Sequence, residues 1–89
     1  MESQFSPLEL FGLRMKELRK EKGISQEQLA LISGIARGYL GGVERGQRNI
    51  ALLNIYKLAH ALNVAPSKLL EPPTPELIES LKIKRLKKS

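Results

Sequence analysis

The segment from Ser25 to Gly34 constrains the fold more than any other, because it leaves room for a helix of barely two turns. It opens with Ser-Gln-Glu-Gln, in which Ser25 can cap a helix while Gln28 bonds back to the cap. Leu29, Ala30 and Ile32 then supply its apolar residues, and Gly34 ends it. The pattern predicts a helix of about eight residues that turns directly into another helix.

Helix signals also dominate the rest of the chain. A capping serine and a proline at residues 6–7 predict a helix that stops at Gly23. A further helix is expected from about Ala51 to Asn63, and a short one from Pro66. No segment alternates with period two, so we predict an all-α fold with a compact five-helix domain over residues 1–70. Apolar residues recur at helical spacing at Phe11, Met15, Leu18, Ile55, Leu58, Ala59 and Leu62.

A proline cluster at residues 72–75 marks a boundary, since a helix cannot continue through it. Residues 71–89 are therefore predicted to form a separate basic tail, which could contain a short helix. That helix would pack on a partner through Leu77, Ile78 and Leu81. The tail could instead be a mobile basic arm that adds phosphate contacts, or an end without a role. Its basic residues are Lys82, Lys84, Arg85, Lys87 and Lys88.

The composition favours a polyanionic partner. Fifteen Lys and Arg face nine acidic residues, all Glu, which gives a net charge of +6 and a pI near 9.9. There is no Cys and only one His, so no metal site, cofactor or enzymatic activity is predicted. The absence of a long apolar run predicts a cytoplasmic protein that does not bind membranes. No small-molecule ligand is expected.

The two helices around Gly34 favour a helix-turn-helix, whose second helix would enter the major groove of DNA. Residues 24–30, Gly34, and residues 39–46 together resemble the lambda-repressor-like, Xre-type helix-turn-helix family. Residues 37–49 are similar to the controller proteins of restriction–modification systems. This resemblance implies a transcriptional regulator that binds double-stranded DNA as a homodimer on a palindromic operator, with helix 36–45 in the major groove. RNA polymerase would be a further partner if the protein activates transcription.

The glycines of residues 36–49 raise the alternative of a phosphate-binding loop. That alternative fails, because such a loop follows a strand and needs Gly-Lys-Ser or Gly-Lys-Thr, whereas Val43 follows Gly42 here. Inside a helix, each glycine costs about 0.5–1 kcal/mol relative to Ala. We expect Gly41 to permit close helix packing. Gly38 and Gly42, four residues apart, should share the face that approaches DNA.

By the family's pattern, residues 37, 38 and 42 read bases, and only Arg37 among them has a long side chain. Arg37 should therefore provide most of the direct readout, bidentate to a guanine, with a plain phosphate contact as the alternative. Tyr39 should contact a phosphate or the sugar edge, unless it is simply exposed. The predicted DNA-binding residues are Ser25, Gln26, Gln28, Ala36, Arg37, Gly38, Tyr39, Gly42, Arg45, Gln47, Arg48 and Asn49.

Most of the other residues in that set are expected to contact the DNA backbone rather than the bases. The N-terminus at Ser25 offers free N–H groups to a phosphate, and the Gln26 side chain can donate as well. Residues 45–49 would clamp the DNA backbone, or form an ordinary solvated loop. Ala36 stands where the family commonly has a capping Ser or Asp. The resemblance further implies a structural ion pair between Arg19 and Glu44.

A second apolar stripe lies on the predicted helix 51–63, off its core-facing positions. Such a stripe favours a self-complementary dimer interface, although the chain's own arm or tail could cover it instead. The predicted interface residues are Leu53, Tyr56, His60, Val64, Leu69 and Leu70. The leading alternative function is a protein-interaction module of the antitoxin type with mainly non-specific DNA binding, since one arginine in a glycine-rich helix reads few bases.

Overall fold

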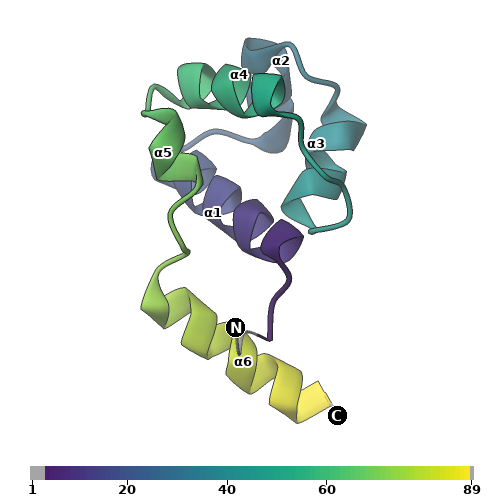
Figure 1. The fold of residues 1–89 in the computed structure, drawn as a ribbon, viewed down its shortest axis with the longest axis vertical. Coiled ribbons are helices and arrows are strands. Elements are labelled where there is room, and N and C mark those ends of the chain that lie inside the picture. The colour runs from purple at the N-terminus through teal and green to yellow at the C-terminus, as the bar shows by residue number, and fades with distance from the viewer. Residues whose placement is uncertain (1–3, 89) are drawn as a thin grey trace.

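The computed structural model describes residues 4–88 and, within them, contains helices and no strands (Figure 1). The predicted all-α fold is confirmed, and all five helices expected in the N-terminal part are present. The C-terminal segment forms a sixth helix. The helices are α1 (Pro7–Glu21), α2 (Gln26–Ser33), α3 (Arg37–Glu44), α4 (Leu52–Leu62), α5 (Pro66–Leu69) and α6 (Pro75–Lys88).

The helix ends follow the capping signals of the sequence. Ser6 and Ser25 each accept a hydrogen bond from the backbone N–H three residues on and donate their own N–H back to that residue's side chain. Gly34 ends α2 at φ 75° and Asn63 ends α4 at φ 56°, both in the left-handed region. Local chemistry therefore determines where these two helices stop.

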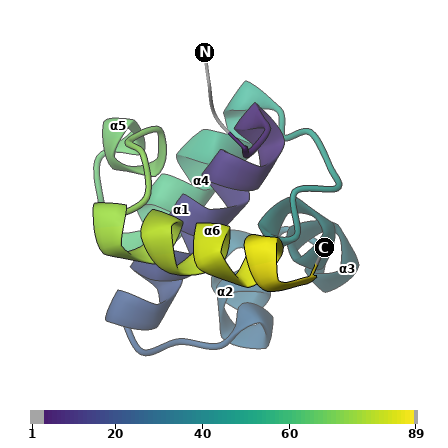
Figure 2. The same ribbon diagram turned by 90° about the horizontal axis from the view of Figure 1, so that it is seen from below.

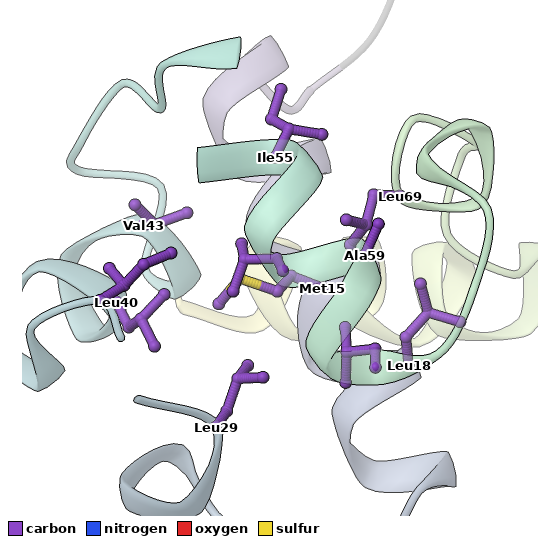
Figure 3. Close-up of a cluster of buried hydrophobic side chains, with 11 residues drawn as sticks. Met15, Leu18, Leu29, Leu40, Val43, Ile55, Ala59 and Leu69 are labelled. Atoms are coloured by element: carbon purple, nitrogen blue, oxygen red, sulfur yellow. The ribbon is translucent and has the colours of Figure 1, made fainter. Parts of the chain in front are cut away.

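One apolar core holds the first five helices together (Figure 3). α1 packs against α3 and α5, α2 against α3 and α4, and α4 against α5. Met15, Leu29, Leu40 and Leu58 are wholly buried where these helices meet. The three apolar residues expected in α2 differ in burial. Ile32 is exposed, because α2 turns only Leu29 and part of Ala30 toward the core.

Polar contacts hold the proline-rich connection before α6. Arg14 is buried and donates to the Lys68 carbonyl and to the carboxylates of Glu17 and Glu71. Glu17 in turn accepts bonds from the backbone N–H and the hydroxyl of Thr74. These contacts tie the start of α6 to α1.

α6 lies below the other helices in Figure 1 and crosses in front of α1 in Figure 2, which is seen from below. Arg85 fastens its far end, donating to the Gln4 carbonyl and to Glu9 at 2.6 Å each. The same guanidinium lies 4.1 Å from the centre of the Phe5 ring, a cation–π contact. The tail therefore contains a helix, as one alternative expected, and polar contacts tie this helix to its own chain. Packing on a partner through Leu77, Ile78 and Leu81 stays a prediction. Within residues 4–88 no helix combines the length and apolarity needed to cross a membrane.

Candidate DNA-binding interface

α2 and α3 form two short helices joined by a tight turn. Gly34 and the residues up to Ala36 reverse the chain, and α3 begins at Arg37. Ala36 makes no side-chain bond to the helix, so the first N–H groups of α3 lack a side-chain cap. Arg37 is exposed at this open end. The long cationic side chain of Arg37 is therefore exposed at the N-terminal end of α3.

A buried ion pair holds the other end of α3. Arg19 of α1 donates from Nε and Nη2 to the two carboxylate oxygens of Glu44, at 2.6 and 3.1 Å. Its remaining nitrogen, Nη1, donates to the Ile24 carbonyl at 2.9 Å. The pair implied by the family resemblance is thus present. Its bidentate geometry makes it a strong, directional tie between α3 and α1.

Gln26 is part of the same network. Its amide donates to Glu44 at 2.8 Å, so this side chain points inward and supports the ion pair. The sequence predicted that this amide would donate to a phosphate. The bond to Glu44 uses part of its donor capacity. Ser25 and Gln28 are both exposed, but the capping box already uses the backbone N–H of each. The prediction that the N–H at Ser25 is free is therefore wrong, and a phosphate would have to use the N–H groups of Gln26 and Glu27 at the start of α2.

The surroundings of the three glycines in α3 differ from the prediction. A Cβ on Gly38 would meet nothing within 4 Å, so this position is open as expected. Gly42 is buried, and a Cβ there would lie 2.5 Å from Cγ of Arg48. The expectation that Gly42 presents bare backbone to DNA is wrong, because the Arg48 side chain covers it. Gly41 faces the side chains of Arg45 and Gln26.

Among the described glycines, Gly12 of α1 has the closest neighbours, and the sequence patterns did not single it out. A Cβ on Gly12 would lie 2.4 Å from the Val43 carbonyl oxygen and 2.5 Å from that of Glu44. Backbone atoms cannot move aside as a flexible side chain can, so only glycine fits. A glycine in the middle of an otherwise regular helix was the available signal. Gly12 sets how closely α3 lies against α1.

Tyr39 and the loop after α3 are braced together. The Tyr39 hydroxyl donates to the Asn49 carbonyl at 2.7 Å, so the half-buried ring holds the end of the loop. Gly46 has φ 73° and packs against the backbone of Glu9, which leaves no room for a side chain. The loop is therefore anchored on both sides. Its polar residues stay exposed: Arg45, Gln47, Arg48 and Asn49.

A family model described as helix-turn-helix matches residues 15–69, which include α2, α3 and their supports. The chain belongs to the helix-turn-helix family. The family predicted from the residues is thereby confirmed.

The helix-turn-helix relatives include restriction–modification controllers. C.AhdI from Aeromonas hydrophila is 57% identical with a TM-score of 0.71, over 73% of this chain and 98% of that one. The control protein C.SmaI from Serratia marcescens is 45% identical, over 70% of this chain and 74% of its own length. The C.Esp1396I tetramer, solved with its natural 35 base-pair operator, is 27% identical with a TM-score of 0.68, over 86% of this chain and 95% of that one.

The predicted second surface is largely exposed on this helix-turn-helix domain, with one error. Leu53, Tyr56, His60 and Leu70 are exposed, and Val64 is half-buried. Leu69 is wrongly assigned to an interface, because it is 0% exposed and belongs to the domain's own core. The short α5 turns Leu69 inward and Leu70 outward. Leu52, which the prediction omitted, is exposed as well.

Proposed function

We propose that this chain is a sequence-specific DNA-binding transcriptional regulator of the controller type. In this proposal α3 lies in the major groove, Arg37 reads a base edge, and the start of α2 and the loop after α3 contact phosphates. The observation that carries it is the placement of Arg37. It stands exposed at the open end of a helix whose other end a buried ion pair holds in place.

Pre-organisation supports this function over a purely structural role for α3. The Arg19–Glu44 pair, the amide of Gln26 and the glycine contact at Gly12 all hold α3 in one position. A fixed helix loses little conformational entropy when it binds, so more of the contact energy becomes affinity. Gly38 beside Arg37 leaves the backbone open to the duplex.

Random-sequence selection followed by a mobility shift tests the function. We expect a palindromic site, with affinity falling sharply on scrambled DNA. Salt-sensitive binding that ignores sequence would overturn the regulator proposal and favour the protein-interaction module. The controller assignment has a separate test in the flanking genes, where it predicts a methyltransferase and an endonuclease.

A homodimer would place two copies of α3 on the two half-sites. We propose that the exposed patch formed by Leu52, Leu53, Tyr56 and Leu70 joins the two subunits, since so many apolar side chains seldom cluster on a monomer's surface without a partner. Leu53→Glu should shift sedimentation toward the monomer, because it places a charge inside the interface. Leu31→Glu alters a leucine on α2 that is also exposed, 85% against 68% for Leu53, and is the control. Equal behaviour of the two variants would contradict this interface.

A further inference from the structure

An open cleft of about 550 Å³ lies between α1, the end of α3 and α6. Besides Arg85, which is paired with Glu9, three basic side chains from different elements line it: Lys16 of α1, Arg45 after α3, and Lys84 of α6. All three residues are exposed. The cleft therefore brings together cations that are far apart in the sequence.

The carboxylates of the cleft do not neutralise these cations. Glu9 is paired with Arg85 at 2.6 Å, and Glu44 with Arg19 at 2.6 Å. Of the carboxylates in residues 4–88, none lies within ion-pairing distance of Lys16, Arg45 or Lys84. The cleft has surplus positive charge, which favours an anionic partner.

α6 holds Lys84 in place beside the proposed DNA-contacting loop. In Figure 1 the C-terminal end of α6 lies on the same side of the molecule as α3 but well below it, and the two overlap in Figure 2, which is seen from below. Lys84 of α6 and Arg45 line the same cleft. Thr74 anchors the start of the helix on Glu17, and Arg85 anchors its end on Glu9. A lysine on a docked helix loses less freedom on binding than one on a mobile arm.

We propose that Lys84, together with Lys16 and Arg45, contacts the sugar–phosphate backbone of DNA outside the base pairs that α3 reads. This proposal rests on the proposed DNA-binding function and deepens it. The occupant is duplex DNA because Arg45 belongs to the loop already assigned to phosphates, so the cleft continues that surface. C.AhdI matches over 98% of its own length but only 73% of this chain, so part of this chain has no counterpart there.

Lys84→Gln in the full chain tests the contact, with Lys22→Gln as the matched control. Lys22 is also exposed, but it caps the opposite end of α1, away from the cleft. The probe is the duplex obtained by selection, in a long form and in a form trimmed to the half-sites, with binding followed by fluorescence anisotropy over a range of KCl concentrations. Wild-type protein should bind the long duplex more tightly. Lys84→Gln should lose about threefold on it, with the salt slope reduced by about 0.9.

The two duplexes separate the possible outcomes. Lys84→Gln should match wild type on the trimmed duplex, and Lys22→Gln should match it on both. Equal losses on both duplexes, or no loss on either, would overturn the proposed contact while leaving the regulator intact. If the wild-type protein selected no preferred DNA sequence, the proposed function itself would be contradicted. The selection experiment gives that result before any variant is made. Arg85→Gln, which releases the end of α6, should reproduce the loss on the long duplex.

Discussion

Two arginine–glutamate pairs at opposite ends of α3 show how differently the same chemistry can act. Arg19 and Glu44 are 2.6 Å apart, with side chains only 10% and 4% exposed. Arg37 and Glu27 are 3.8 Å apart, with side chains 63% and 75% exposed. Water screens the second pair, which therefore contributes at most about 1 kcal/mol to the stability of the fold. The buried pair fixes the helix, whereas the exposed pair leaves Arg37 free to exchange its partner for a base at little cost.

The largest expected effect comes from breaking the buried pair. Glu44→Ala leaves the Arg19 guanidinium buried without its carboxylate, which should lower the free energy of unfolding by about 3–5 kcal/mol. Urea denaturation followed by circular dichroism measures this. Glu27→Gln removes the corresponding acid from the exposed pair and should change stability by less than about 0.5 kcal/mol. Similar losses in the two variants would contradict the contrast between the pairs.

A smaller effect should follow from pushing α3 away from α1 without touching any charge. Gly12→Ala places a Cβ against the carbonyls of Val43 and Glu44, and such overpacking costs about 1–3 kcal/mol. Gly38→Ala is the control, because its Cβ points into open space and the alanine favours the helix. The melting temperature of the wild type should therefore lie between those of the two variants. A Gly12→Ala protein as stable as wild type would show that the α1–α3 contact can relax.

Arg37→Ala should change recognition rather than stability. We expect a loss of about 1–3 kcal/mol of discrimination at one base position, with the melting temperature nearly unchanged. Arg48→Ala, which removes a side chain from the loop, should instead weaken binding to all sequences alike. Competition binding against single-base operator variants separates the two results. An equal loss on all sequences from both substitutions would sink the assigned role of Arg37.

The smallest effect concerns a third pair of intermediate exposure, Glu9 with Arg85. The pKa of Glu9 lies below its ordinary value of 4.5, chiefly because its carboxylate accepts the backbone N–H of Ser6; partial burial opposes this shift and Arg85 reinforces it. A lowered pKa means that the stabilisation is fully present above about pH 4.5 and is lost as pH falls through the folded-state value. Urea titrations at several pH values should show the stability difference between wild type and Glu9→Gln shrinking in acid. A difference independent of pH would contradict this linkage.

The helix ends and the family could be predicted from the sequence, because both depend on local patterns. Capping serines, Gly34 and Asn63 act within a few residues, so their effect can be predicted without knowledge of the packing. The spacing around Gly34 likewise indicated the helix-turn-helix. Arg19 and Glu44 could be paired only through the family resemblance, since they are 25 positions apart.

The errors share a physical cause, which is contact between a helix and residues outside it. Periodicity placed Gly42 on an open face, yet Arg48 folds back over it. It also left Leu69 free for a partner, although α5 directs this side chain into the core. Neither result follows from helical spacing, because spacing defines which residues share a face and not what covers that face.

The sequence by itself determined the first five helices and the ends set by their capping residues, because those properties belong to short segments. That Arg37 reads a base stays a prediction from its side-chain length. Only the tertiary structure decided that Gly12 sets the distance between α1 and α3, and that α6 docks beside the loop after α3. Both depend on atoms brought together from different parts of the chain. The position of Arg37 in the proposed complex therefore depends on contacts that lie outside the motif itself.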